Sequence, residues 1–300
     1  MTTWRIWIKA FRLRTLPLAM SATILGSFLA YANATFKWTV FIFGMMTTLF
    51  LQVLSNLAND YGDALKGTDN ENRLGPLRVT QSGLVTRRHM RWMITLFVTL
   101  SLVSGILLIH AGLGHGKAWV YMLFLLLGLT AIYAAIKYTI GKKPYGYAGL
   151  GDLMVFVFFG ILGVAGTYYL HTNHFYPALL LPASAIGLFS MGVLNLNNMR
   201  DIENDRSNGK RTLAVRLGQN RAKIYHLTLL GAGFVMSLAY TIIHFRSAWQ
   251  FLFMLALPLL VSDARKVWVN VMPAELNAEL KKLALATLLF SLSFGIGLIL

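Results

Sequence analysis

The 300-residue chain is too apolar for a water-soluble domain, since 56% of its residues are hydrophobic and only 13% are charged. A soluble domain carries about a quarter charged residues, so the composition excludes an ordinary soluble enzyme and indicates repeated membrane spans. The absence of cysteine excludes disulfides and thiolate metal sites. Basic loops retained at one membrane face explain the formal charge of +16 more simply than nucleic-acid binding does.

Apolar runs of near-spanning length predict an all-α polytopic membrane protein with nine transmembrane helices in one bundle. In chain order, we expect the spans at about 15–33, 38–57, 93–111, 118–136, 153–171, 177–195, 226–244, 249–264 and 283–300. The eighth is the shortest in purely apolar length. The segment AYANA at 30–34 follows basic residues and an apolar run, as in a secretory signal, but we expect it to stay as part of the first span.

The basic residues predict the orientation of the chain. With a cytoplasmic N-terminus, all 27 lysines and arginines except Lys37, Lys117 and Arg246 fall on the cytoplasmic side of the predicted spans. All 11 acidic residues fall there too. Because positively charged loops are retained in the cytoplasm, this pattern predicts a multi-pass membrane protein with its reactive face on the cytoplasmic side.

Two similar stretches end the second and sixth predicted spans: NLANDYGD at 56–63 and NLNNMRDIEND at 195–205. A long basic loop follows each of them. This correspondence predicts a single domain over 1–300, built from two four-helix pseudo-repeats at about 1–140 and 141–270, with the helix at 283–300 added. Internal repeats of this kind commonly place a binding site between the two halves.

Each of these stretches carries a pair of carboxylates at helical spacing. Asp60 and Asp63 are three residues apart, and Asp201 and Asp205 are four apart, so each pair shares a helix face. Like charges near a bilayer are costly unless a cation compensates them. Oxygen ligands without histidine or cysteine favour Mg²⁺, which binds a few carboxylates plus substrate phosphates. One alternative is that both clusters are ordinary solvated loops with salt bridges; the duplication favours a site for a lipid diphosphate.

The two stretches also resemble a known family. NDYGDALKGTD at 59–69 and RDIENDRSNGKRTLAVRLG at 200–218 are similar to the two Asp-rich motifs of the UbiA superfamily of intramembrane aromatic prenyltransferases. GTDN at 67–70, GPLRVTQSG at 75–83 and KPYGYAGLGDLMVFVFFG at 143–160 most resemble its branch that acts on 1,4-dihydroxy-2-naphthoate in menaquinone synthesis. A third aspartate, four residues after Asp63 in many relatives, is replaced by Gly67, and the next carboxylate is Asp69.

The resemblance implies Mg²⁺-dependent transfer of a polyprenyl group from polyprenyl diphosphate to the naphthoate, with loss of CO₂, to give demethylmenaquinol or demethylmenaquinone. It also implies a location in the bacterial plasma (inner) membrane. It implies metal ligands among Asp60, Asp63, Asp69, Asp201, Asp205 and Asn56. Asn59 and Asn198 join the aspartates in the implied catalytic set by orienting the carboxylates or completing coordination. Substrate contacts are expected from Arg78, Tyr138, Lys142, Tyr145, Arg206, Lys210 and Arg211.

Other functions also fit parts of the pattern. Another aromatic acceptor, such as 4-hydroxybenzoate or homogentisate, would leave the superfamily assignment intact. A cation-coupled transporter would also use intramembrane carboxylates and paired halves, but it needs ionisable groups in mid-span, where this chain has almost none. A lipid phosphotransferase acting on nucleotide-activated alcohols is disfavoured because neither cluster has a D-G-x-x-A-R sequence. The expected partners are both substrates and the lipid bilayer, and not nucleic acid.

Overall fold

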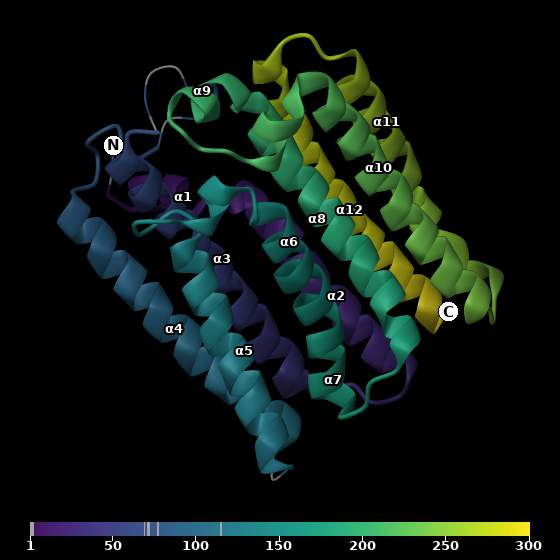
Figure 1. Cartoon of the computed structure of the whole chain (residues 1–300). Coiled ribbons are helices and arrows are strands. Elements are labelled where there is room, and N and C mark those ends of the chain that lie inside the picture. Colours follow the sequence, from purple (N-terminus) through teal and green to yellow (C-terminus); the bar gives the residue numbers. More distant parts are fainter. Residues whose placement is uncertain (1–2, 69, 71–72, 77, 115) are drawn as a thin grey trace.

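The structure is a computed structural model that describes residues 3–68, 70, 73–76, 78–114 and 116–300. Its described residues form helices and connecting loops without a β-strand, which confirms the predicted all-α class (Figure 1). The main helices are α1 (Thr3–Phe11), α2 (Leu16–Ala32), α3 (Trp38–Lys66), α4 (Arg87–Leu113), α5 (Ala118–Lys137), α6 (Gly151–Val155), α7 (Thr167–Thr172), α8 (Leu180–Arg200), α9 (Ile202–Ser207), α10 (Leu213–Ile243), α11 (Leu257–Val269) and α12 (Leu276–Ile299).

Tighter or wider helical turns connect several of these helices. Four are short 3₁₀ turns, at Leu13–Thr15 (η1), Tyr145–Ala148 (η2), Pro177–Leu179 (η4) and Pro273–Glu275 (η6). A longer 3₁₀ stretch, η5 (Ala248–Ala256), precedes α11. Between α6 and α7 the chain forms η3 (Phe156–Gly166), a π-helix, so that these three elements make one continuous membrane-length segment.

Eight helical stretches among the described residues are long and apolar enough to cross a membrane. They are Trp4–Ala32, Trp38–Lys66, Arg87–Leu113, Ala118–Lys137, Gly151–Thr172, Pro177–Arg200, Leu213–Ile243 and Pro273–Ile299. The predicted span at 249–264 corresponds to η5 and α11, which does not meet this condition. Its apolar part is short because α11 carries Asp263, Arg265 and Lys266. The count of nine spans is therefore not confirmed, whereas a multi-pass membrane protein is.

The long helices lie side by side in one bundle (Figure 1). On one side α3 packs against α4, and α5 completes this group by contacting both. On the other side α8 packs against α10 and α12, while η5 and α11 cover α12. Helix α2 joins the two groups because it contacts α3, η3 and α12. The division into two pseudo-repeats stays a prediction.

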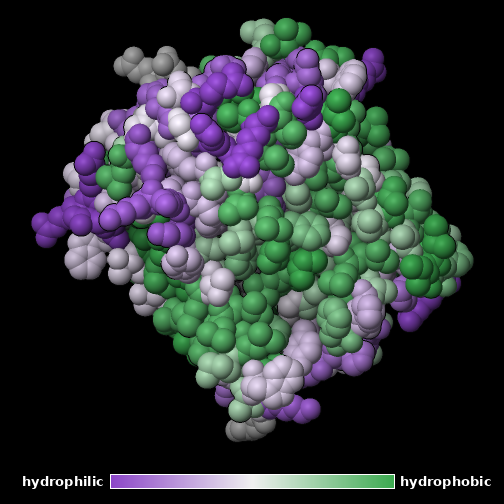
Figure 2. Space-filling model, in the orientation of Figure 1, coloured by the Kyte–Doolittle hydropathy of each residue, from purple (hydrophilic) through white to green (hydrophobic). Residues whose placement is uncertain are grey.

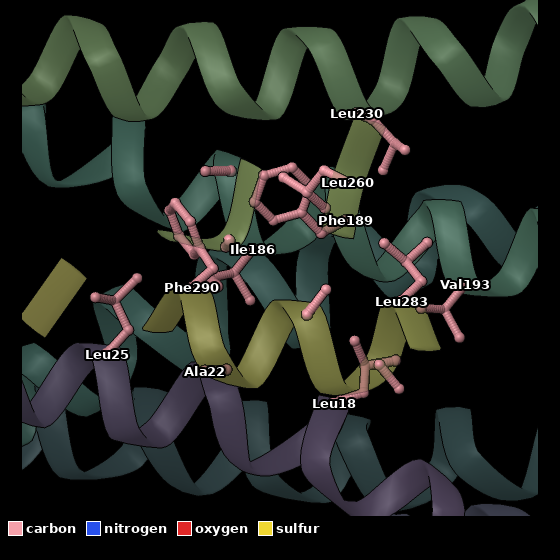
Figure 3. Packing of buried hydrophobic residues seen from close by; sticks show 14 of the residues in the cluster. Leu18, Ala22, Leu25, Ile186, Phe189, Val193, Leu230, Leu260, Leu283 and Phe290 are labelled. Carbon is pink, nitrogen blue, oxygen red and sulfur yellow. The ribbon is translucent and has the colours of Figure 1, made fainter. Parts of the chain in front are cut away.

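The main hydrophobic core lies where α8, α10 and α12 meet α2 (Figure 3). The rings of Phe189 and Phe290 pack edge to face with centroids 5.1 Å apart, and Phe253 and Phe294 extend this aromatic group. All four side chains are almost completely buried. Aromatic pairs in this geometry add roughly 0.5–1.5 kcal/mol beyond the burial of their area, so this group stabilises the second side of the bundle.

Polar and apolar surfaces separate along the bundle (Figure 2). Hydrophilic residues gather at the end that carries α9 and the N-terminus, and an apolar surface lies beside it. We call the hydrophilic end the aspartate end, since it contains Asp63 and Asp205. At the opposite end, the Lys37 ammonium donates to the carbonyl oxygen of Gly112 at 2.8 Å. Most basic residues of the connecting segments lie at the aspartate end, whereas Lys37 lies at the opposite end.

Candidate active site

One lysine connects the two aspartate clusters. The Lys210 ammonium lies 3.4 Å from an Asp205 carboxylate oxygen and 4.0 Å from an Asp63 carboxylate oxygen, and all three side chains are buried. Asp63 also binds the Arg78 guanidinium at 2.8 Å and accepts a hydrogen bond from the Tyr147 hydroxyl at 2.8 Å. The motifs from the two halves of the sequence therefore meet at a single charged centre.

Local backbone geometry places these groups. Helix α3 ends at Lys66 and is followed by Gly67, whose φ of 70° is a left-handed conformation and whose N–H donates to the Asp63 carbonyl. Asp63 consequently lies in the last turn of a spanning helix. Gly209, with a φ of 70°, turns the chain after α9 so that the Lys210 N–H donates to the Asp205 carbonyl at 2.8 Å. This turn returns the lysine side chain to the carboxylates.

Asp60 contacts the loop after α3 instead of the charged centre. Its two carboxylate oxygens accept hydrogen bonds from the backbone N–H groups of Val79 and Thr80, each at 3.2 Å. The same loop carries Arg78, which also donates to the Asn59 carbonyl at 2.6 Å. Asp60 therefore anchors the segment that presents Arg78 to Asp63.

Asp201 is held by two arginines. Arg200 donates to both of its carboxylate oxygens, at 3.1 and 2.6 Å, and the Arg73 Nε lies 3.7 Å away. Arg200 is buried and also donates to Asn197 and Asn277. Arg200 was not singled out in the sequence, although its position directly before Asp201 in the motif was available as a signal. Its bidentate geometry shows that the second cluster has its own fixed counterion.

The charges shift the ionisation of these groups. Burial raises the pKa of Asp205 to about 6, and Lys210 limits the rise. Burial opposes ionisation of Asp201 as well, but the hydrogen bonds and charge of Arg200, with Arg73, outweigh it and lower the pKa of that carboxyl. For Lys210, burial disfavours the ammonium, yet Asp63 and Asp205 raise its pKa. Lys210 thus stays cationic between the two carboxylates.

Cations outnumber carboxylates at this end among the described residues. Arg12, Arg14, Arg73, Arg78, Arg200 and Lys210 lie with Asp60, Asp63, Asp201 and Asp205. The excess positive charge suits an anionic ligand, and arginine matches phosphate or carboxylate geometry in particular.

A cavity of about 360 Å³ opens from this charged centre into the bundle. Asp63, Arg78 and Lys210 lie in its wall, with Arg12 and Asn59. The rest of the lining is mostly apolar and comes from α2, α3, α4, α5, η3 and α8, including Leu51, Leu108, Phe124, Leu127, Ala131, Phe158, Phe159, Leu162 and Leu194. A cavity with charged groups at one end and apolar walls beyond it fits an amphiphilic ligand.

The predicted aromatic contacts are found at this cavity. Tyr138 and Tyr145 both line it, with ring centroids 5.4 Å apart in an edge-to-face arrangement. The Tyr145 hydroxyl donates to the Ala134 carbonyl at 2.9 Å. Tyr147, which the sequence reasoning missed, contacts the charged centre directly, because Asp63 accepts its hydrogen bond and Lys210 lies 5.5 Å from its ring centroid. Tyr145 and Tyr147 both belong to the turn η2, and of these two the structure brings Tyr147 to Asp63.

The three predicted asparagines lie in different surroundings. Asn59 lines the cavity and accepts a hydrogen bond from Thr139 at 3.4 Å. Asn56 also lines the cavity, but its amide donates to the Phe11 carbonyl and the Thr15 hydroxyl, so it holds the corner between α1 and α2. Asn198 is buried outside the cavity lining, and its side-chain oxygen has no hydrogen-bond partner among the described residues.

Three predicted substrate contacts are not brought to the cavity. Lys142, Arg206 and Arg211 are exposed and absent from its lining, and Arg206 pairs with the exposed Glu203 at 2.9 Å. Their roles in substrate binding stay predictions. Asp69, the remaining predicted metal ligand, lies outside the described residues.

The charged centre fits a metal that is held jointly by protein and substrate. The described residues contain no group of three or more histidine, cysteine, aspartate or glutamate side chains that could hold a metal alone. Magnesium, however, is usually bound through one or two carboxylates together with substrate phosphates. Asp63 and Asp205, which already share one cation in Lys210, supply such a pair of carboxylates.

The fold and this site define a membrane protein with a cationic centre, suited to an anion such as diphosphate, at one end of a mostly apolar cavity. Comparison with known proteins agrees with this assignment. The chain belongs to the UbiA prenyltransferase family, whose model matches residues 19–286. It is 45% identical to "1,4-dihydroxy-2-naphthoate octaprenyltransferase" of Escherichia coli (strain K12) over 98% of this chain and 95% of that protein. The resemblance drawn from the two Asp-rich motifs is thereby confirmed.

Solved structures show the same fold. The chain superposes on the apo structure of a UbiA homolog from Aeropyrum pernix K1 with a TM-score of 0.69 at 17% identity, covering 96% of this chain and 98% of that one. A UbiA homolog from Archaeoglobus fulgidus bound to DMAPP and Mg²⁺ matches with a TM-score of 0.59 at 17% identity, over 96% of this chain and 98% of that one.

Proposed function

We propose that this protein transfers a polyprenyl group from polyprenyl diphosphate to 1,4-dihydroxy-2-naphthoate. The reaction releases diphosphate and CO₂ and gives demethylmenaquinol. The observation that carries the proposal is the cavity that joins a cationic centre, formed by Arg78 and Lys210 beside Asp63, to long apolar walls. The name of the E. coli relative, at 45% identity over nearly the whole chain, supports the naphthoate as acceptor.

The cofactor of this reaction is proposed to be Mg²⁺, supported by the A. fulgidus structure bound to DMAPP and Mg²⁺. When bound, the metal neutralises the diphosphate leaving group and so favours breakage of the allylic C–O bond. Asp63 and Asp205 would hold it, with Asp60, Asp69, Asp201 and Asn56 as the other predicted ligands. Arg78 and Lys210 bind the diphosphate oxygens and stabilise their growing negative charge.

The cavity walls surround the prenyl group of the substrate and protect the cation that it forms. Loss of diphosphate leaves an allylic cation, which water would destroy, and the apolar lining excludes water from it. Tyr138 and Tyr145 line the same cavity, and the π faces of such rings stabilise a cation. The electron-rich naphthalene ring then attacks the cation, and the new C–C bond replaces the bond to the lost carboxylate.

The proposed orientation places this reaction on the cytoplasmic side of a bacterial inner membrane. The loops at the aspartate end carry most of the basic residues, whereas Lys37, Lys117 and Arg246 lie in the segments that join the helices at the other end. Retention of positively charged loops in the cytoplasm supports a cytoplasmic N-terminus and active site.

A cation-coupled transporter is less well supported. A cation-coupled carrier needs ionisable groups along a path through the middle of the membrane. The charged residues that line this cavity lie at the aspartate end, and its deeper wall is formed by residues such as Leu108, Ile109, Phe124 and Leu170. This distribution favours an enzyme that acts at one membrane face on a substrate with an apolar tail.

The acceptor assay tests the proposal most directly. Purified protein with Mg²⁺ and a polyprenyl diphosphate is incubated separately with 1,4-dihydroxy-2-naphthoate, 4-hydroxybenzoate and homogentisate, and prenylated products are quantified. We expect turnover with the naphthoate and release of one CO₂ per product. Preference for either other acceptor would reject the naphthoate as the acceptor but leave the prenyltransferase activity in place. No turnover with any acceptor would reject prenyl transfer itself.

A further inference from the structure

Helix α3 carries a row of polar side chains along the wall of the cavity. Gln52, Asn56, Asn59 and Asp63 are spaced by four, three and four residues, so they share one helix face, and all four line the cavity. Gln52 lies about three turns before Asp63, which is roughly 16 Å along the helix axis. Gln52 is therefore the member of this row that lies farthest from the charged centre.

The side-chain amide of Gln52 is held in one orientation. Its NH₂ group donates to the Thr15 hydroxyl at 3.1 Å and to the Asn56 side-chain oxygen at 3.4 Å. The Thr15 hydroxyl donates its own proton to the Arg12 carbonyl at 3.0 Å, so it has none left for Gln52. Asn56 is fixed in turn, because its NH₂ group donates to the Phe11 carbonyl at 2.9 Å. A reversed Gln52 amide would bring its oxygen against two acceptors.

The oxygen of this amide, Gln52 Oε1, is buried without a hydrogen-bond partner in the part of the chain that the structure describes. The residue is only 9% exposed. Leaving a buried acceptor unpaired is unfavourable. The contact with Thr15 and Asn56 uses only the NH₂ group, so a structural role explains the nitrogen of this side chain but not its oxygen. Because Gln52 forms part of the cavity wall, a ligand bound there can supply the missing donor.

Of the two proposed substrates, the aromatic acceptor is the one that offers a hydrogen-bond donor. A polyprenyl diphosphate bound to Mg²⁺ presents anionic oxygens and hydrocarbon, and neither donates a hydrogen bond. In 1,4-dihydroxy-2-naphthoate, the 1-hydroxyl lies next to the carboxylate and donates to it within the molecule. The 4-hydroxyl has no such internal partner. Its proton is therefore the one available to Gln52 Oε1.

The wall next to Gln52 also suits an aromatic ring. Leu18 and Ala19 follow Thr15 by three and four residues, so they lie on the same face of α2, and both line the cavity. Their side chains offer apolar contact without a hydrogen bond. Gln52 thus adds one directional polar contact to an apolar wall, which is the usual composition of a site that binds a small molecule in one orientation.

We propose that Gln52 is a specificity-determining residue that accepts a hydrogen bond from the 4-hydroxyl of the aromatic acceptor. The inference rests on the proposed naphthoate substrate and adds the residue that recognises its second hydroxyl. Gln52 takes no proton in the reaction; it binds and orients the ring. A site built to hydrogen-bond a substrate hydroxyl rejects analogues that lack it, so Gln52 selects against rings without this group.

The test is a binding cycle with two ligands and two proteins. The ligands are 1,4-dihydroxy-2-naphthoate and 1-hydroxy-2-naphthoate, which lacks only the 4-hydroxyl. Their dissociation constants are measured by anaerobic titration calorimetry in detergent for the original protein and for Gln52→Met, which keeps a side chain of similar length without the oxygen. We expect the original protein to prefer the dihydroxy ligand about tenfold, and Gln52→Met to bind both ligands within about twofold.

Thr48→Val is the matched control. Thr48 lies one turn before Gln52 in α3 and also lines the cavity, but its hydroxyl is already paired with that of Thr23 at 2.7 Å. Loss of a hydroxyl that is satisfied within the protein should leave the preference for the dihydroxy ligand as it is in the original protein. A preference lost in this variant as well would show that any polar group in the wall has the same effect, and would reject a specific role for Gln52.

Equal binding of the two ligands by the original protein would overturn the proposal. So would an undiminished preference in Gln52→Met, since a merely structural glutamine weakens both ligands alike. If Gln52→Met does not fold, Gln52→Leu takes its place in the cycle. Failure of the proposed function looks different, because the original protein would then show no turnover of the naphthoate in the acceptor assay, which uses no Gln52 variant.

Discussion

The two sides of the bundle are packed very differently. On the side of α8 and α12, 67% of the 18-residue apolar stretch in Pro177–Arg200 is buried within the protein, and 56% of the one in Pro273–Ile299. On the other side the corresponding shares are 28% for Arg87–Leu113 and 11% for Ala118–Lys137. The dense side contains the aromatic group around Phe290, whereas α4 and α5 of the sparse side contribute to the wall of the cavity.

This difference indicates that one side of the bundle mainly stabilises the fold and the other mainly makes room for the substrate. A substrate with a long apolar tail needs space beside lipid, and that space removes helix-to-helix contacts from α4 and α5. In a membrane, helices associate mainly through close packing, because lipid is as apolar as their side chains. We therefore expect changes on the dense side to affect stability and changes at the cavity to affect turnover.

Metal removal should have the largest effect, and it acts only on the cavity side. EDTA should abolish prenyl transfer because the diphosphate leaving group loses its neutralising charge, and added Mg²⁺ should restore it. The melting temperature in detergent, measured in parallel, should change little because Lys210 already pairs with both Asp63 and Asp205. Full activity in metal-free buffer would contradict the proposed mechanism.

Asp63→Asn should give the next largest effect. The substitution removes the carboxylate that joins Arg78, Tyr147 and Lys210, and we expect kcat to fall by about 10²–10³, as for loss of one preorganised electrostatic group. Glu203→Gln is the matched control, because this exposed carboxylate pairs with the exposed Arg206 and lies outside the cavity lining. Equal turnover in both variants would remove Asp63 from the site.

Phe290→Ala tests the dense side. The ring is fully buried against Phe189, Phe253 and Phe294, so its loss leaves a void in the core. We expect destabilisation at or below the ~3–5 kcal/mol typical of soluble cores, since lipid replaces water around the unfolded helix and mainly the packing contribution is lost. Denaturant titration in detergent measures this change. A fall in kcat at full occupancy without loss of stability would break the comparison.

The smallest effects come from two alanine substitutions with opposite expected signs. Gly128→Ala should raise stability by up to about 1 kcal/mol, since its Cβ enters open space and alanine favours the helix. Gly233→Ala should lower stability, because its Cβ would lie 2.6 Å from the Phe189 ring. Melting temperatures of the pair give the measurement. Equal shifts would show that both sides tolerate added volume alike.

Much of the helical framework could be predicted from the sequence. Apolar runs marked the spans, and the helices at Trp38–Lys66 and Ala118–Lys137 begin where the predicted spans at 38–57 and 118–136 do. The span at 249–264 was the exception, because apolar composition does not report a 3₁₀ stretch such as η5 or the charged end of α11. Periodicity alone does not distinguish these from a full spanning helix.

The site was predictable as a cluster but not in its internal arrangement. Helical spacing placed Asp60 and Asp63 on one face, yet Asp60 binds the amides of Val79 and Thr80 while Asp63 lines the cavity. The same limit applies to Arg200 and Tyr147. Which partner each charge takes depends on loops that return from distant parts of the chain, and spacing within one helix carries no information about them.

Lys210 has a consequence for what happens between turnovers. Carboxylates gathered to receive a cation would repel each other once that cation leaves with the product. Because the lysine is tethered by the Gly209 turn and stays protonated, an ammonium remains between Asp63 and Asp205 at that moment. The charged centre of the empty enzyme is therefore preformed, and the next substrate binds without rearrangement of Asp63 and Asp205.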